Sequence, residues 1–483
     1  MVEQDQDEPQ TRRMTSPLPH GTGSAGTPLQ PSGTSSAYDE YTSGRSSGAP
    51  RPASMSEARP SNSSAPKPDP RRYDPDIKPR FNTGRRKRLI VLTIVVVLLS
   101  LLCIGGYILL YAGKGQDKNL ETASNSADSQ GLPEDTSTIR MLATGDWIAH
   151  DAINQEAETD KNTWDYAPMA AGFKKSFAGS DINFCNQATL AGGTAFGISG
   201  YPVFNAPLEW IGAMKGLGCN VINTGTNHTN DKGQAPITAQ LDEWDKQNVL
   251  AVAGSNRSAE EQNKVRYFEV KGFKFALLSY STYSNAPNPN PYSLNRFEEP
   301  LVSNQMKEAR ANADVVMVSM RWGTEYSEVL NAAQDAQSQK LSDLGADIIL
   351  GHGTHTLQPV KRLAGQGGNE TIVWYGLGNF LNAQLETTGL TGCVAAFTYD
   401  IPTKKFVDST CLPFYQHYEW TAEEKAAGKL LARKNFRIMP LYEAQDYMAK
   451  SQLGTTVEAQ TERIQNIVNT YTKIPVDDGR NTL

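Results

Sequence analysis

Residues 138–146 read TIRMLATGD, and they contain the pattern that recurs through the rest of the domain, an apolar run that ends in polar residues. The apolar run at 139–144 predicts a short buried strand, which ends in the polar pair Gly145 and Asp146. Short apolar runs of the same kind recur along the chain, and helix-like stretches separate them. These runs are at residues 181–184, 220–223, 249–253, 273–279, 315–319, 347–350 and 372–375. Because such alternation gives sheets covered by helices, the sequence predicts an α/β fold with largely buried sheets.

Polar side chains follow several of these predicted strands. They are Asp146, Asn186 and Gln187, Asn227 and His228, Arg321, and His352 with His355. Functional groups of α/β proteins collect at the carboxyl ends of strands, so we expect these side chains to lie together. Carboxylate, amide and imidazole groups that converge from separate loops are what a divalent metal site requires. A single histidine is more often structural, but four of the six histidines lie in or near these loops, at positions 150, 228, 352 and 355.

The N-terminal part of the chain has a different composition. Ser, Pro and Gly make up 30 of the first 70 residues, which leaves few apolar side chains to offset the entropy lost on ordering. We therefore predict a disordered tail over residues 1–84, on the cytoplasmic side of a membrane.

One uninterrupted apolar run follows the tail. Leu89–Ala112 contains no charged residue and is long enough, as a helix, to cross a bilayer. Residues 85–88 before it are all basic, so the positive-inside rule places the N-terminus in the cytoplasm and the main domain outside the cell membrane. We predict a single-pass anchor over 85–112, a polar linker over 113–137 and an extracytoplasmic domain beyond it. This excludes a soluble cytosolic enzyme and a multi-span transporter.

The charge of the chain is divided in the same way. The formal net charge is −6 overall, but residues 1–88 carry +4 and the remainder carries −10. An acidic exported part argues against nucleic acid as a partner, since that would need a basic surface. An anionic substrate would have to be met through a metal ion or a local basic site.

Four cysteines lie outside the predicted membrane helix. Residues 393–411 read as a hairpin centred near residue 402, which brings Cys393 and Cys411 opposite each other. We predict that this pair is within disulfide reach, with two free buried thiols as the alternative. No pairing is predicted for Cys185 and Cys219.

The order of several longer blocks resembles the CapA family of poly-γ-glutamate capsule synthesis proteins, a branch of the calcineurin-like metallophosphoesterase superfamily. The blocks are Gly145-Asp146, Asn186-Gln187, residues 199–207, residues 226–233, residues 321–326, Gly351–Pro359 and residues 375–380. The resemblance covers about residues 138–415 and implies a four-layer α/β/β/α sandwich. It also implies a role in making, exporting or anchoring an anionic cell-surface polymer, with capsule synthesis or export subunits as partners. We expect residues 416–483 to form a helical C-terminal extension.

The same resemblance implies roles for individual residues. Asp146, Asn227 and His355 match metal ligands for Mn, Fe or Zn, and His228 matches the histidine that protonates a leaving group. Three positions depart from the pattern, because Ala188, Arg321 and Gly353 stand where many relatives have Glu, His and His. Ala and Gly carry no ligand atoms, and Arg is a permanent cation. His352 is the nearest replacement ligand, with His150 and Asp151 as further alternatives.

Two hypotheses follow from these departures. The first is a membrane-anchored, metal-dependent hydrolase or transferase of the polymer, with His228 as general acid. The second is a catalytically degenerate relative that binds the polymer or scaffolds an export complex, with weak, single or absent metal binding. In the second hypothesis Arg321 holds a carboxylate or phosphate, unless it pairs with Glu325 on the same loop.

Overall fold

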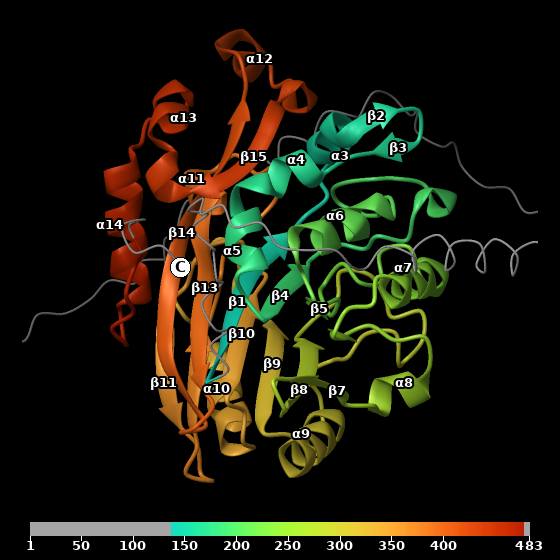
Figure 1. Cartoon of the computed structure of the whole chain (residues 1–483). Helices are drawn as coiled ribbons and strands as arrows, with labels where there is room; N and C mark the ends of the chain where they lie inside the picture. The colour runs from blue at the N-terminus through green and yellow to red at the C-terminus, as the bar shows by residue number, and fades with distance from the viewer. Residues whose placement is uncertain (1–136, 478–483) are drawn as a thin grey trace, which may run out of the picture. The chain divides into compact units, whose positions relative to one another are not determined.

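All eight predicted strands form, and they are divided between two sheets in the computed structural model, which describes residues 137–477. The first sheet has the strand order β15-β14-β13-β1-β4-β5-β6 (Figure 1). Its strands are β1 (Thr138–Trp147), β4 (Ile182–Gln187), β5 (Val221–Asn223), β6 (Ala251–Ala253), β13 (Thr391–Asp400), β14 (Lys405–Glu419) and β15 (Lys434–Pro440). β1, β4, β5 and β6 run parallel, whereas β13 pairs with β1 in the antiparallel sense.

The second sheet has the order β11-β12-β10-β9-β8-β7, with parallel inner strands and an antiparallel strand at each edge. Its strands are β7 (Arg266–Val270), β8 (Phe273–Ser281), β9 (Val315–Arg321), β10 (Ile348–His352), β11 (Val360–Ala364) and β12 (Glu370–Trp374). A separate short pair is formed by β2 (Glu158–Asp160) and β3 (Thr163–Trp164).

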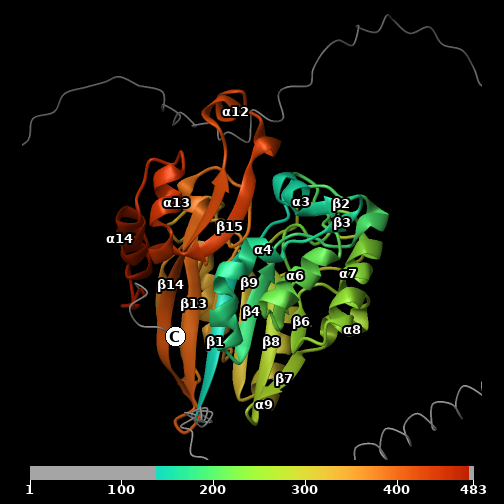
Figure 2. The same ribbon diagram turned by 45° about the horizontal axis from the view of Figure 1, so that its top comes forward.

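The two sheets share one apolar core, and helices cover their outer faces. Alternate residues of β1, such as Met141, pack with Met317 and Leu350 of the second sheet, while Leu142 on the opposite face packs under helices. The helices over the first sheet are α3 (Asp151–Ala157), α4 (Ala167–Ala170), α5 (Lys174–Ala178), α6 (Glu209–Leu217) and α7 (Gln234–Lys246) (Figures 1 and 2). Those over the second sheet are α9 (Leu301–Asn312) and α10 (Ala332–Asp343). The predicted α/β fold is confirmed.

The C-terminal region differs from the prediction. The boundary placed at residue 415 falls inside β14, and the segment expected to be helical also supplies the edge strand β15. This strand was missed because its solvent side carries Lys434 and Arg437, so that no continuous apolar run marks it. The remaining helices are α8 (Ala259–Asn263), α11 (Thr387–Leu390), α12 (Ala422–Ala426), α13 (Gln445–Lys450) and α14 (Val457–Val468).

Helix α14 contributes to the domain core. Its Ile464 and Val468 belong to the apolar cluster between the two sheets. Its Arg463 Nε donates to Glu328 Oε1 at 3.0 Å, and the Arg463 guanidinium also donates to Thr391 Oγ1 at 2.9 Å. The helix therefore ties β13 to the loop that follows β9.

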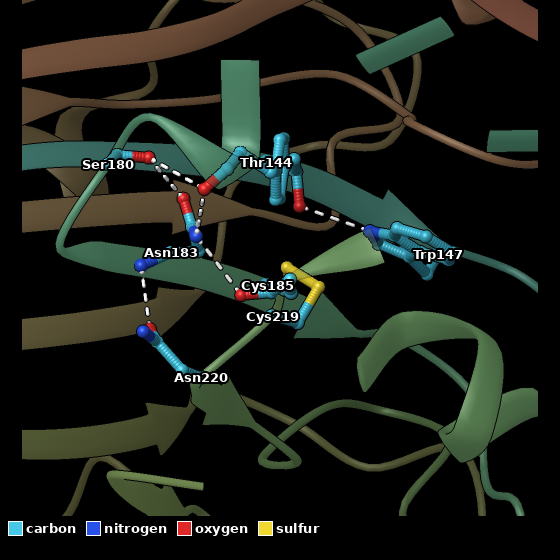
Figure 3. Close-up of a disulfide and its surroundings, with 9 residues drawn as sticks. Thr144, Trp147, Ser180, Asn183, Cys185, Cys219 and Asn220 are labelled. Carbon is cyan, nitrogen blue, oxygen red and sulfur yellow. Dashed lines mark hydrogen bonds between the residues drawn. A yellow bond between two sulfur atoms is a disulfide. The ribbon is translucent and has the colours of Figure 1, made fainter. Parts of the chain in front are cut away.

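Two disulfides join neighbouring strands. The predicted Cys393–Cys411 bond is confirmed, with the two Cα atoms 5.3 Å apart, although a register shift near Thr398 places Cys411 opposite Ala395. A second bond, Cys185–Cys219, links β4 to the turn before β5 and was not predicted (Figure 3). Cysteines of adjacent parallel strands have no sequence symmetry comparable to that of a hairpin, so nothing in the spacing marks this pair.

None of the helices within residues 137–477 is long and apolar enough to cross a membrane. The predicted tail at 1–84, the basic flank and span at 85–112 and the linker up to residue 136 lie outside the described residues.

Candidate functional site

The predicted site residues come together where strands of both sheets end. Asp146 lies near the end of β1, Asn227 and His228 lie in the loop after β5, and Arg321 ends β9. His352 ends β10 and His355 follows it. Parallel pairing of β9 with β10 places His352 beside Arg321, and direct contacts link Asp146 to His355 and Arg321 to Asn227.

Asp146 is the buried centre of this cluster, with no exposed surface. Its Oδ1 accepts hydrogen bonds from Asn186 Nδ2 at 2.5 Å and from Gly353 N at 3.2 Å. Its Oδ2 lies 2.9 Å from His355 Nδ1. Burial by itself raises the pKa of Asp146, but the contact with His355 and the charge of Arg321 outweigh it, and the net pKa lies below the ordinary value. Asp146 is therefore a fixed negative charge.

His355 is held by Asp146 and by a residue that the sequence analysis did not single out. Its Nδ1 lies 2.9 Å from Asn379 Oδ1 as well as from Asp146 Oδ2. Its backbone is left-handed, with φ +61°, an unusual conformation for a residue that is not glycine. The ring contacts Tyr326, and 12% of the side chain is exposed. His355 is thus oriented from behind by two oxygen atoms and reaches the surface.

His352 lies deeper in the cluster and is neutral. Its Nε2 lies 3.1 Å from Asn223 Nδ2 and 2.8 Å from Ser319 Oγ, both of which can donate to it. The proton then sits on Nδ1, which is 3.9 Å from Asp146 Oδ1 and has no hydrogen-bond partner among residues 137–477. Burial is the main cause that lowers the pKa of His352 to about 3, with Arg321 and His355 acting in the same direction and Asp146 opposing them.

His228 forms a second carboxylate-backed histidine. Its Nδ1 lies 2.7 Å from Asp231 Oδ2, and its Nε2 lies 3.3 Å from Asn285 Nδ2. Phe204 packs edge-on against the ring, and Asp231 also accepts a hydrogen bond from Phe204 N at 2.7 Å. No role was predicted for Asp231, although its position three residues after His228 is a signal that could have identified it.

Arg321 is enclosed by protein groups, with 1% of the residue exposed. Its Nε donates to Asn227 Oδ1 at 2.8 Å, and its guanidinium donates to Glu325 Oε1 at 2.8 Å and to the Tyr283 hydroxyl. The guanidinium also lies over the Tyr283 ring. Of the two alternatives predicted for Arg321, an anion contact or an ion pair with Glu325, the structure contains the ion pair.

The side chains present do not fit the two-metal centre that the family resemblance implies. Asn227 Oδ1 faces a guanidinium, Asp146 Oδ1 is already hydrogen-bonded, and Ala188 and Gly353 have no ligand atoms. Across the described range 137–477, no group of three or more His, Cys, Asp or Glu side chains is arranged to hold a metal ion.

The further ligands considered from sequence are also engaged elsewhere. His150 Nδ1 accepts a hydrogen bond from Ala383 N at 3.1 Å, and Asp151 Oδ1 accepts one from Gly200 N at 2.7 Å. Neither residue replaces the ligands that are missing.

Comparison with known proteins agrees with the family resemblance. The model of the family described as bacterial capsule synthesis protein PGA_cap matches residues 140–384. The PGA biosynthesis protein CapA of Bacillus subtilis (strain 168) is 31% identical over 176 residues, which are 36% of this chain and 45% of that protein. The capsule biosynthesis protein CapA of Bacillus anthracis is 31% identical over 184 residues, 37% of this chain and 43% of that protein. The matched region thus spans less than half of either relative.

Two solved structures are similar at a lower level. A phosphatase from Mycoplasma pneumoniae has a TM-score of 0.35 and 13% identity, covering 57% of this chain and 93% of its own. A protein of Thermus thermophilus has a TM-score of 0.30 and 10% identity, covering 57% of this chain and 99% of its own. Scores this low carry no argument about activity.

Proposed function

Because this chain belongs to the family of bacterial capsule synthesis proteins, we propose that it acts in the synthesis, export or anchoring of an anionic cell-surface polymer. Poly-γ-glutamate is the polymer to test first, since one relative is a PGA biosynthesis protein. We further propose that Leu89–Ala112 anchors the protein in the cell membrane and that residues 138–477 work on its outer side, together with capsule synthesis or export subunits.

Two histidines of the site, His228 and His355, each have a carboxylate oxygen close to Nδ1. This pair supports a proposal for where the polymer binds. The side chains of His228 and His355 are 11% and 12% exposed to solvent, whereas Asp146 and Arg321 are fully buried.

When it is protonated, an imidazole held at Nδ1 presents Nε2–H as a charge-assisted donor to a carboxylate. At His228 the amide of Asn285, which lies 3.3 Å from Nε2, has to give way to that carboxylate. We therefore assign the polymer contact to His228 and His355. Arg321 lies behind them, paired with Glu325, and does not contact the polymer.

Poly-γ-glutamate should bind the full chain in detergent, and His228→Ala or His355→Ala should weaken that binding by about tenfold each, as expected for a hydrogen bond between charged groups. Binding is measured by fluorescence anisotropy of end-labelled polymer. Lys264→Ala is the matched control, because it removes a basic side chain that lies in an exposed ion pair with Glu260, outside the site contacts. If both histidine variants bind like the control, the polymer does not use this site.

A second candidate function, cleavage or transfer of the polymer, is favoured by the 2.7 Å contact between His228 and Asp231. A carboxylate that orients a histidine is the usual arrangement for a general acid. In this case Asp231→Asn should lower the rate of polymer shortening by about 10²-fold or more, a much larger effect than its effect on polymer binding. Polymer length is followed by gel filtration. Length that stays constant with the wild-type chain supports binding alone.

A further inference from the structure

At the ends of β9 and β10, the side chain of Arg321 fills the space beside the Cα atom of Gly353. Gly353 follows His352 with φ +86°, and a Cβ placed on it would lie 2.0 Å from Arg321 Cδ, 2.1 Å from Nε and 2.3 Å from Cζ. Contacts under 3.0 Å require one of the two groups to shift, so the arginine side chain, as it is placed, fills the space that a side chain at position 353 would enter. A larger residue at this position would require the guanidinium to move away from Asn227 and Glu325.

The guanidinium also contacts one of the expected metal ligands, Asn227. The amide oxygen of Asn227 points at Arg321 Nε, while the Asn227 amide nitrogen has no hydrogen-bond partner within the described part of the chain. Glu325 Oε1 and the Tyr283 hydroxyl approach the same guanidinium from the other side. A buried guanidinium is tolerated only when oxygen atoms surround it in this way.

We propose that the Arg321 guanidinium takes the place of a divalent cation in this site and that Gly353 is the residue that makes room for it. The cation is then part of the chain, cannot be removed by chelators and offers no open coordination position. Arg321 and Gly353, which look like two separate losses of a ligand in the sequence, then depend on each other. This inference concerns the cation alone and does not depend on which polymer is bound.

The first test measures metal binding by the full chain in detergent. After treatment with EDTA, titration calorimetry with MnCl₂ and with ZnCl₂ should show no saturable binding that depends on Asp146. The melting temperature should change by less than about 1 °C with either ion, because a ligand that does not bind the folded state does not stabilise it. Stoichiometric binding that is lost in Asp146→Asn would overturn the proposal, whereas binding that persists in this variant lies elsewhere and agrees with it.

The second test is a double-mutant cycle that measures the Arg321–Gly353 coupling. Gly353→Ala should lower the melting temperature by about 5 °C more in the wild-type background than in Arg321→Ala, because removing the arginine removes the clash. The strain of an alanine at positive φ is common to both backgrounds and cancels. Gly272→Ala reports that strain alone, since Gly272 has φ +79° and no described atom lies within 4 Å of its added Cβ.

Equal losses in the two backgrounds would overturn the coupling. If Arg321→Ala does not fold, the metal titration of the wild-type chain still decides the proposal. Polymer binding is measured on the same samples with and without EDTA. Binding that fails in both conditions counts against the proposed function, whereas binding that requires the metal counts against the built-in cation.

Discussion

Gly145→Ala is expected to lower the free energy of unfolding by more than about 4 kcal/mol or to prevent folding. A Cβ at position 145 would lie 1.9 Å from the carbonyl oxygen of Gly378 and 2.8 Å from its carbon. Both are backbone atoms and cannot rotate away. The close approach is needed because Asp146 N donates to this carbonyl at 2.9 Å, and the contact sets Asp146 beside Asn379.

Gly216→Ala is the control for this prediction, because the same substitution should stabilise the protein at this position. Gly216 lies on the exposed side of α6, where no described atom comes within 4 Å of the added Cβ. Alanine is the better helix former, so this variant should be more stable by about 0.5–1 kcal/mol. Urea unfolding followed by tryptophan fluorescence compares the three proteins. A Gly145→Ala midpoint equal to that of the wild type would show that β1 and the Gly378 turn do not pack as described.

Acid should destabilise the protein steeply, because two histidines are buried in their neutral form. Burial is the main cause that lowers the pKa of His150 to about 3, with the charge of Arg433 in second place, and His352 behaves similarly. Between about pH 6.5 and pH 3 the unfolded chain therefore binds more protons at these positions than the folded chain. The free energy of unfolding falls as the pH falls, by about 3 kcal/mol for each histidine between pH 7 and pH 4.

The pH dependence can be assigned by removing one titrating group. His150→Gln keeps a polar group near Ala383 N but cannot be protonated, so the slope of stability against pH near pH 5 should decrease by about 1.4 kcal/mol per pH unit. Asp347 and Glu156, whose carboxyl pKa values are raised by burial, oppose the trend in both proteins alike. Urea unfolding at pH 7, 6 and 5 measures the slopes. An unchanged slope would mean that His150 titrates normally in the folded protein.

Most of the strands that could be predicted lie inside the two sheets, although β6, at an edge of the first sheet, was predicted too. The segment at 315–319 is apolar at nearly every position, since β9 has neighbours on both sides and a helix layer outside. The strands of the two large sheets that were missed, β7, β11 and β15, lie at sheet edges, where one side is only partly buried and charged residues interrupt the run. An edge strand is specified by the partner it pairs with, which a local pattern does not contain.

The candidate site was predicted as a set of residues but not as an arrangement. Strand ends identified Asp146, His352 and His355, because parallel strands bring their carboxyl ends to one edge. The partners Asn379 and Asp231 act through contacts to histidines that come from folding of the loops. The link between Arg321 and Gly353 depends on the volume of one side chain at one backbone position, so it emerges only from three-dimensional packing.

The contacts of Arg463 have a consequence for how this part of the chain can vary among relatives. Through Glu328 and Thr391, α14 holds the loop that carries Glu325 at the site rim. Helix α14 is therefore not an independent module, and a graft from another family member would leave Glu328 without its cation. We expect the two segments to be exchanged together or not at all.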